Sequence, residues 1–329
     1  MLIIGFFVRH FTERGTEVAI YDYAKYNEEI LKNKSYIICL SEKGANLYNF
    51  PYIKISYEKF NKRFMIITID KIEDMENVIK FCNINYFYTL TNGYYDIYKF
   101  DDKKIWKNCK TIKHAVFTTL CDESDFYISI SNFLNEKNNT KLPVIPHIVN
   151  YHNTNENLRN ELNIPIDAIV LGRYGGYEDF NIEFTYEAIK EYLKSNENTY
   201  FIFMNTKVFY NHKKIIYLNL NLDLEYKNKF INTCNFMLHA RIIGETFGLS
   251  IAEFSIKNKP IITCNCGDIE HIKILGDKAI IYNSKDELLS IFNNLQKILE
   301  SKKDWNAYSY FSAENIMNLF NKYIFNKNI

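Results

Sequence analysis

Neither sign of charge dominates this chain, and no long basic block occurs in it. The 40 Lys and Arg residues are almost balanced by 39 Asp and Glu residues, so the formal net charge at pH 7 is +1. Proteins that bind the phosphate backbone of nucleic acids usually present a basic stripe or patch. We therefore expect no nucleic-acid partner.

The sequence also lacks an apolar run long enough to cross a bilayer. Its opening segment is apolar, but Arg9 and His10 follow within the length of one strand. A transmembrane helix needs about 20 predominantly apolar residues, and a signal peptide starts with a basic segment that is missing here. We interpret the opening as a first buried strand and expect a soluble, cytoplasmic protein without a membrane span.

Cysteine spacings of the zinc-binding type are absent as well. No pair of CxxC motifs and no matching Cys/His spacing occurs. Cys264 and Cys266 are the only close pair, and we expect both to be reduced structural residues. The cysteines are scattered along the chain, at positions 39, 82, 109, 121, 234, 264 and 266.

Short apolar runs alternate with helix-length segments throughout the 329 residues. This alternation is typical of parallel α/β architecture. It predicts strands at Leu2–Val8, Ser35–Leu40, Phe64–Ile69, Tyr86–Leu90, Thr111–Val116, Phe126–Ile130, Val144–Ile148, Ala168–Gly172, Tyr200–Asn205, Ile215–Leu220, Phe236–His239, Pro260–Thr263 and Ala279–Tyr282. The predicted helices include Glu17–Leu31, Ile72–Phe81, Phe184–Ser195, Asp223–Thr233, Ser250–Lys257, Asp286–Ser301 and Ala313–Ile324.

A polar segment at 150–163 separates the two halves and predicts a linker with a short helix before Pro165. We expect one Rossmann-like domain over residues 1–150, a second over 151–305, and a terminal helix within 306–329 that packs back on the first domain. Open parallel sheets bind ligands beyond the carboxyl ends of their strands. A ligand cleft between the two domains is the natural expectation.

The segment HARIIGETFGLSIAEFSIKNKPIIT, residues 239–263, is the most informative stretch for function. Its pattern predicts a strand, a loop over Gly244–Leu249, a helix and another strand. The amino end of a helix suits a phosphate, and Gly248 permits close approach of the backbone. Glu245 and Glu253 flank this point, and carboxylates accept hydrogen bonds from sugar hydroxyls. Read alone, two such glutamates are solvated helix residues; in this context they predict a donor site.

Glu245 and Glu253 are separated by seven residues, with TFGLS between them and KPII after them, and they resemble the E-x7-E motif of retaining GT-B glycosyltransferases of family 4. The likeness continues through the NCGDIE segment at 265–270 and through the strand-end Gly172-Arg173 upstream. In the first half it rests on Lys113-His114 at a strand end and on the Arg14-Gly15-Thr16-Glu17 loop. The resemblance implies a GT-B fold with two Rossmann-like α/β/α domains.

Residue by residue, the resemblance implies a role for each matched position. Glu253 binds the ribose hydroxyls and Glu245 the hydroxyls of the transferred sugar, while Arg173 offsets the charge of the departing diphosphate. His114 lies beside the sugar and stabilises the developing cation. The backbone N–H groups of Phe247, Gly248 and Leu249 hold the diphosphate. Thr246 and Gly15, the latter in the loop after the first strand, also belong to the donor-binding residues.

The reaction implied by the resemblance is a front-face substitution that retains the anomeric configuration. The leaving phosphate assists deprotonation of an acceptor hydroxyl, on a glycan or a small molecule, so no nucleophile of the enzyme is needed. The donor is a nucleotide-diphosphate sugar, and no obligatory divalent metal is expected. The family is also distinguished from the metal-dependent glycosyltransferase fold, for which acidic clusters such as Asp122–Asp125 and Asp223–Glu225 would be the metal ligands.

One position departs from the family pattern. The family has a lysine six residues after the arginine, whereas this chain has Asp179 six residues after Arg173. A carboxylate cannot neutralise the negative charge of a diphosphate. Arg241 is the candidate for the missing cation, because a guanidinium binds phosphate in a bidentate manner, and Arg14 is the next candidate.

Alternatives remain open at this point. His114 alone would be a satisfied core histidine, and Gly15 a turn glycine. A non-catalytic GT-B module that binds a nucleotide sugar or a glycan is favoured by the missing lysine and disfavoured by the intact glutamates. A nucleotide-sugar epimerase of the same architecture would need further acid/base carboxylates. Fold alone does not decide among these functions.

Overall fold

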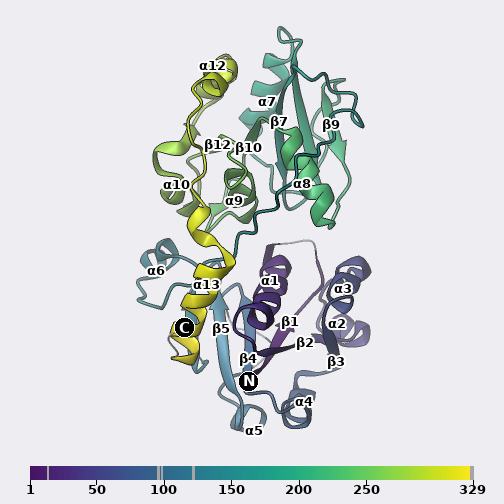
Figure 1. Ribbon diagram of the computed structural model, residues 1–329, viewed down its shortest axis with the longest axis vertical. Helices are drawn as coiled ribbons and strands as arrows, with labels where there is room; N and C mark the ends of the chain where they lie inside the picture. The colour runs from purple at the N-terminus through teal and green to yellow at the C-terminus, as the bar shows by residue number, and fades with distance from the viewer. Residues whose placement is uncertain (13–14, 95–96, 98, 121–122, 327–329) are drawn as a thin grey trace. The chain divides into compact units, whose positions relative to one another are not determined.

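The computed structural model describes residues 1–12, 15–94, 97, 99–120 and 123–326. Arg14 and Asp122, for which the sequence offered roles, lie outside the described residues. The chain divides into two compact units (Figure 1): Met1–Ile148 with Phe311–Ile329 form the first, and Val149–Tyr310 form the second.

A six-stranded parallel sheet forms the centre of the first unit, with the strand order β3-β2-β1-β4-β5-β6. Nearly all positions along β1, β2, β4 and β5 are buried, as expected for a parallel sheet that is covered on both faces. The strands are β1 Ile3–Val8, β2 Lys34–Leu40, β3 Met65–Ile69, β4 Tyr86–Thr91, β5 Lys110–Ala115 and β6 Phe126–Ser129.

Helices from both ends of the sequence pack on this sheet. They are α1 Gly15–Glu29, α2 Glu42–Leu47, α3 Lys54–Asn61, α4 Met75–Cys82, α5 Lys103–Trp106, α6 Asn132–Asn138 and α13 Ala313–Phe320. The last of these buries Ile316, Met317 and Phe320 on one face, and the ring of Phe320 lies 5.5 Å from that of Tyr23 on α1. Apolar residues at helical spacing explain why this segment belongs to the first unit.

The second unit repeats this plan with the strand order β14-β12-β10-β7-β8-β9, again all parallel. Its strands are β7 Ile169–Tyr174, β8 Thr199–Met204, β9 Ile215–Leu218, β10 Phe236–His239, β12 Ile261–Cys264 and β14 Ala279–Tyr282, with a small ladder of β11 Gly244–Glu245 and β13 Asp268–Ile269. Its helices are α7 Glu183–Tyr192, α8 Leu224–Thr233, α9 Leu249–Ser255, α10 Glu270–Leu275, α11 Lys285–Phe292 and α12 Leu295–Glu300.

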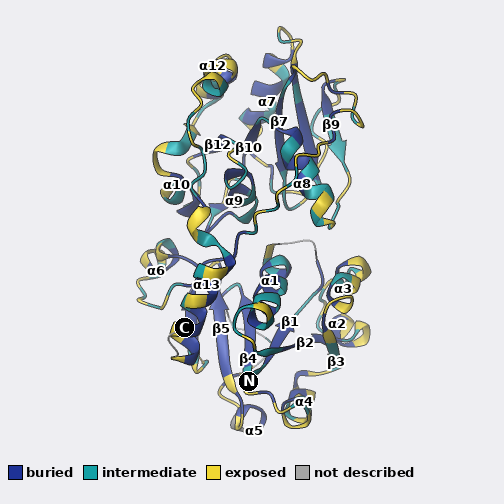
Figure 2. Cartoon of the chain, viewed as in Figure 1, coloured by how far each residue is buried: buried dark blue, intermediate teal, exposed yellow. Residues whose placement is uncertain are grey.

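Both sheets have the same topology. When the strands of each main sheet are counted in chain order, both read 3-2-1-4-5-6, the order of the Rossmann fold. The direction of winding reverses between β1 and β4 in the first unit and between β7 and β10 in the second. Figure 2 shows the inner strands of both sheets as buried elements, with helices that carry exposed positions. The described helices are all too short or too polar to cross a membrane.

Most of the predicted strands are confirmed, but three local predictions were wrong. Val144–Ile148 is buried extended chain with a single bridge at Val144, because Pro146 lacks the N–H that a ladder needs. The predicted helix 286–301 is two helices, α11 and α12, with two asparagines at the break, a residue type that favours caps over helix interiors. The segment 150–163 contains turns but no helix.

Candidate active site

Three neighbouring strands of the second sheet end in polar side chains. β7 ends with Arg173 and Tyr174, β10 with His239, and β12 with Thr263 and Cys264. Since β12, β10 and β7 are adjacent and parallel, their carboxyl ends lie at one edge of the sheet. This edge contains the point where the winding reverses, which is where open α/β sheets bind ligands.

The loop after β10 brings Glu245 to this edge. Gly244 has a φ of +65°, and a Cβ there would lie 2.1 Å from the carbonyl oxygen of Asp268, so no larger residue fits. Glu245 pairs with Ile269 in the β11–β13 ladder. Gly248, with a φ of +80°, caps α9. The two glycines thus fix Glu245 between a short ladder and the start of a helix.

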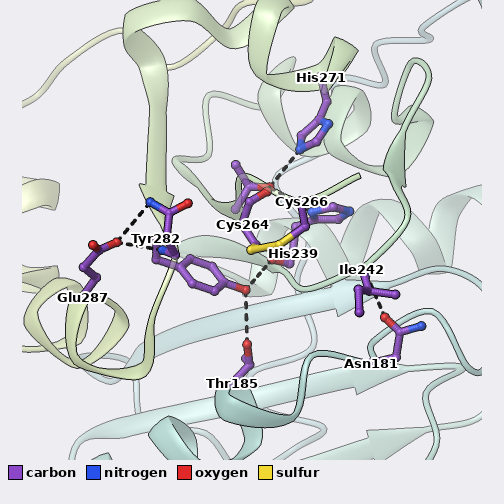
Figure 3. Close-up of a disulfide and its surroundings, with 11 residues drawn as sticks. Asn181, Thr185, His239, Ile242, Cys264, Cys266, His271, Tyr282 and Glu287 are labelled. Atoms are coloured by element: carbon purple, nitrogen blue, oxygen red, sulfur yellow. Dashed lines mark hydrogen bonds between the residues drawn. A yellow bond between two sulfur atoms is a disulfide. The ribbon is translucent and has the colours of Figure 1, made fainter. Parts of the chain in front are cut away.

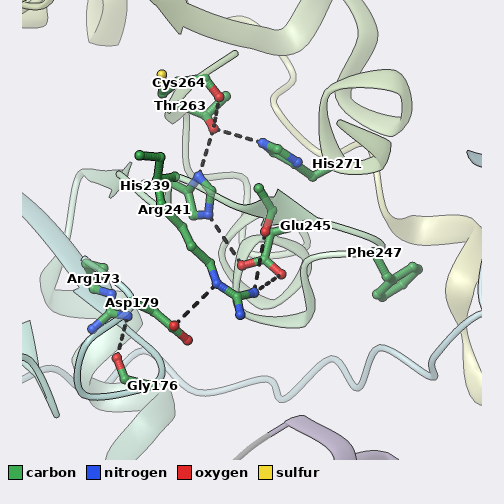
Figure 4. A network of polar contacts seen from close by, with 12 residues as sticks. Arg173, Gly176, Asp179, His239, Arg241, Glu245, Phe247, Thr263, Cys264 and His271 are labelled. Carbon is green, nitrogen blue, oxygen red and sulfur yellow. Dashed lines mark hydrogen bonds and ion pairs between the residues drawn. The ribbon is translucent and has the colours of Figure 1, made fainter. Parts of the chain in front are cut away.

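The carboxylate of Glu245 contacts an arginine on one side and a histidine on the other (Figure 4). Oε2 accepts a hydrogen bond of 3.0 Å from Nη1 of Arg241, and Oε1 lies 3.4 Å from Nε2 of His239. Burial acts to raise the pKa of Glu245, but the hydrogen bond from His239 and the charge of Arg241 lower it to about 2. The side chain keeps 18% of its surface exposed.

A chain of buried polar groups continues behind His239. Nδ1 of His239 lies 2.9 Å from Oγ1 of Thr263, and the same oxygen lies 2.9 Å from Nε2 of His271 (Figure 4). Burial lowers the pKa of His271 to about 3, so this histidine is neutral at pH 7. Sequence reasoning missed His239, Thr263 and His271 as site residues, because their contacts join two strands and a helix.

Arg241 is shared between two carboxylates. Besides its hydrogen bond to Glu245, its Nε lies 3.4 Å from Oδ1 of Asp179. Asp179 occupies the position at which the family has a lysine. It therefore pairs with Arg241, which was the candidate to replace that lysine. The positive charge of Arg241 is balanced by these two acids within the second unit.

Arg173 lies buried beneath the glycine-rich loop that follows β7. Its guanidinium donates hydrogen bonds to the carbonyl oxygens of Gly176 (2.8 Å) and Asn205 (3.2 Å) and to the hydroxyl of Thr206 (2.6 Å). Burial lowers its pKa to about 10, against the effect of nearby carboxylates. Arg173 thus supports two loops at the sheet edge while adding a positive charge there.

Glu253 lies on α9, and two residues that the sequence analysis missed hold its carboxylate. Oε1 accepts a hydrogen bond from the ammonium group of Lys227 on α8, and Oε2 accepts one from the hydroxyl of Tyr174. The ring of Tyr174 stacks on Phe254, with centroids 5.7 Å apart. The position of Tyr174, directly after Arg173, was the only sequence signal for either residue.

The remaining predicted residues of the second unit lie between the two glutamates. Thr246 and Phe247 are buried, and Leu249 begins α9. The ring of Phe247 packs edge-on against Tyr308 at 5.5 Å, and the Tyr308 hydroxyl donates to the carbonyl of Phe247 at 2.9 Å. The first N–H groups of a helix are not used within it, which is the physical basis of the diphosphate contacts predicted here.

Gly15 and His114 belong to the first unit. Gly15 is exposed and begins α1. His114, on β5, is fully buried, with Nδ1 at 2.8 Å from the hydroxyl of Tyr88 and its ring packed against Tyr23. Burial lowers the pKa of His114 well below its usual value, so the ring is neutral at pH 7. The ring lies within an aromatic core, and a role at the donor sugar stays a prediction.

Cys264 and Cys266 form a disulfide beside this site (Figure 3). The expectation that both are reduced was wrong, because the turn through Asn265 brings the two Cα atoms within 5.4 Å. The hydroxyl of Tyr282 next to it donates to the carbonyl of His239 at 2.8 Å. In the part of the chain that the structure describes, no three His, Cys, Asp or Glu side chains are placed to hold a metal ion.

Comparisons with known proteins were made by sequence and by structure. No known family model and no curated protein matches the sequence. Three solved structures among those that match illustrate the fold. A glycosyltransferase from Rickettsia africae has a TM-score of 0.66 at 15% identity, and the match covers 99% of this chain and 95% of that one.

The second is HepE from Anabaena in complex with UDP-glucose, with a TM-score of 0.67 at 12% identity over 98% of this chain and 95% of that chain. The third is a putative UDP-N-acetylglucosamine 2-epimerase from Listeria monocytogenes, with a TM-score of 0.64 at 12% identity. The match covers 99% of this chain and 98% of that chain. At these identities the likeness shows the fold alone. The chain has the GT-B fold, with two Rossmann-like units, and this prediction from the sequence is confirmed.

Proposed function

We propose that the chain is a retaining glycosyltransferase of the family 4 type that moves a sugar from a nucleotide-diphosphate sugar to an acceptor hydroxyl. The observation that carries the proposal is the pair Glu245 and Glu253 at the carboxyl edge of a Rossmann sheet. Each carboxylate is paired with a cation and partly exposed, as expected of groups that accept hydrogen bonds from ligand hydroxyls.

In this proposal Glu253 binds the ribose and Glu245 binds the transferred sugar. The pairing of Glu253 with Lys227 and Tyr174 fixes its orientation while leaving lone pairs for two ribose hydroxyls. HepE, which has the same fold, was crystallised with UDP-glucose, and this supports a uridine diphosphate sugar as the first donor to test. The acceptor is a glycan or small molecule, the cell compartment is the cytoplasm, and no divalent metal is required.

The negative charge of the diphosphate needs donors at the site, but both candidate arginines already have partners. Arg173 already binds loop oxygens, and Arg241 is balanced by Asp179 and Glu245. We infer that the backbone donors at Gly248 and Leu249 contribute more to phosphate binding here than a free cation does. Roles for His114 and Gly15 at the donor stay predictions from the resemblance.

Binding and chemistry are tested with UDP and UDP-glucose as probes. UDP is expected to raise the melting temperature by mass action. Glu253→Ala should weaken UDP binding first, whereas Glu245→Ala should abolish sugar transfer or donor hydrolysis and leave UDP binding measurable. Glucose released by a retaining enzyme is α-glucose before mutarotation, which ¹H NMR detects. Release of β-glucose would contradict retention, and UDP affinity unchanged by Glu253→Ala would contradict the ribose assignment.

A nucleotide-sugar epimerase is the second candidate, favoured by the structural likeness to the Listeria protein. UDP-N-acetylglucosamine is the probe, and ¹H NMR distinguishes its C2 epimer from released or transferred sugar. Epimer formation without transfer would select this function. Binding of UDP without turnover of either sugar nucleotide, at any acceptor tested, would favour a non-catalytic module.

A further inference from the structure

Behind Glu245 a line of buried polar groups runs across the ends of β10 and β12 into α10. It joins the carboxylate to His239, then to the hydroxyl of Thr263, then to His271. All three supporting residues are buried, although buried polar groups are costly unless their hydrogen bonds are satisfied. A second contact fixes the backbone of His239, whose carbonyl accepts the hydroxyl of Tyr282 at 2.8 Å (Figure 3).

The donors and acceptors along this line can be assigned from chemistry. A carboxylate only accepts, so Nε2 of His239 carries the proton that faces Glu245. Oγ1 of Thr263 lies between the two rings and carries one proton, so it donates to one ring nitrogen and accepts a hydrogen bond from the other. The hydroxyl therefore couples the proton positions of His239 and His271.

The carboxylate at the end of this line keeps free capacity. Its four lone-pair positions receive one donor from His239 and one from Arg241. Both donors come from inside the second unit, and the remaining lone-pair positions are those that a ligand hydroxyl would use. A carboxylate held from both sides loses little further freedom when a hydroxyl binds, and preorganised groups of this kind lower reaction barriers.

We propose that His239 is a positioning residue for Glu245, and that Thr263 and His271 hold the His239 ring in the orientation and tautomer that this task requires. The proposal rests on the assignment of Glu245 to the transferred sugar. It adds three residues to the site, none of which touches the substrate.

Thr263 gives the sharpest test, because Thr263→Val keeps the shape of the side chain and removes only the hydroxyl. We expect the kcat for UDP-glucose hydrolysis or transfer to fall about 10- to 100-fold, with UDP affinity by calorimetry within about threefold of the wild type. Thr263→Ser should restore most of the activity, because it restores the hydroxyl. Thr233→Val is the matched control: this hydroxyl is equally buried and hydrogen-bonded, to Leu158 and Lys229, and its loss should leave kcat unchanged.

A spectroscopic measurement makes the test independent of the donor. Long-range ¹H–¹⁵N spectra of the imidazoles should show a proton on Nε2 of His239 in the wild type and in Thr263→Ser. The Thr263→Val variant should show a changed protonation pattern of the His239 ring. His239 unchanged in Thr263→Val, or kcat unchanged in that variant while Glu245→Ala is inactive, would overturn the positioning role. Full activity of Glu245→Ala would instead overturn the proposed function itself.

Discussion

The two units each bury a pair of histidines, and the pairs have different surroundings. In the second unit the rings of His239 and His271 lie 5.0 Å apart and connect through Thr263 to a carboxylate. In the first unit the rings of His114 and His147 lie 6.3 Å apart, and the polar partner of His114 is the hydroxyl of Tyr88. Both pairs consist of buried histidines. The hydrogen bonds of the second-unit pair lead to the carboxylate of Glu245, whereas His114 in the first unit meets the hydroxyl of Tyr88.

This difference shows how the same side chain serves two purposes. A histidine that donates to Glu245 fixes a negative charge at an accessible edge, and that charge is held by Arg241 as well. A histidine that meets a tyrosine in an aromatic core satisfies hydrogen bonds without bringing a charge into the interior. Burial lowers the pKa of both His114 and His271, so burial alone does not identify a site. The neighbouring carboxylate does.

Acid is expected to destabilise the buried histidines of both units. Burial lowers the pKa of His147 to about 4, below the value of about 6.5 for an unfolded histidine. The unfolded chain therefore binds the proton first, and stability that is complete above pH 6.5 is lost as the pH falls toward 4. Each such histidine contributes a slope of up to about 1.4 kcal/mol per pH unit. Urea unfolding at several pH values measures this slope, and His147→Gln should reduce it.

Glu245 should act in a lower pH window. Its folded pKa of about 2 lies below that of an unfolded glutamate, so its contribution is present above about pH 4.5 and is lost as the pH falls toward 2. Urea unfolding of the Glu245→Gln variant below pH 4.5 measures this contribution, which the variant should lack. A pH dependence in that range equal to that of the wild type would contradict the lowered pKa of Glu245.

Arg241→Ala should have the next largest effect, and on turnover more than on folding. It removes the cation that Glu245 and Asp179 share, and we expect turnover of UDP-glucose to fall about 100-fold. The loss of turnover should exceed the loss in free energy of unfolding, because His239 still contacts the carboxylate of Glu245 after the change. Kinetics and urea unfolding on the same preparation compare the two effects. Unchanged turnover would remove Arg241 from the site.

Lys227→Met tests whether charge pairing at the second glutamate matters for nucleotide binding. Glu253 would lose its cation and keep only Tyr174, and we expect UDP affinity by calorimetry to fall about tenfold, or about 1.4 kcal/mol. Lys229→Met is the matched control on the same helix, since Lys229 pairs with Glu156 and Glu225 instead. Equal losses in both variants would point to a general effect of charge.

Tyr88→Phe should have the smallest effect and is the counterpart in the first unit. It removes the hydroxyl that meets His114, and a buried hydrogen bond of this kind contributes about 1 kcal/mol to folding. Urea unfolding measures that loss, and calorimetry should find UDP affinity unchanged. A clear loss of UDP affinity would give the first-unit histidines a more direct part in binding than the comparison assigns to them.

The sequence predicts the strands well because each one is a short apolar run between polar turns. It also locates Glu245 and Glu253, since a glycine loop and a helix follow within a few positions. What it does not predict are the partners of these groups. Asp179 meets Arg241, and Lys227 meets Glu253, across 62 and 26 positions of the chain. Such contacts depend on the strand order, which no local spacing encodes.

Local exceptions have local causes. The buried run at Val144–Ile148 has the composition of a strand, but its proline interrupts the ladder. One residue separates Cys264 from Cys266, and the chain turns there between β12 and β13, which brings the two sulfurs together. Composition could not indicate this turn.

The first unit is discontinuous in the sequence, and this affects how the protein is made. Residues 311–329 complete a unit that begins at Met1, while the whole second unit is encoded between the two parts. Every strand of the second sheet is therefore synthesised before Phe320 can pack on Tyr23 and Phe325 on Tyr86. Until then the nascent first unit lacks the rings that pack on Tyr23 and Tyr86. Synthesis from the N-terminus therefore favours folding of the second unit before the first unit is complete.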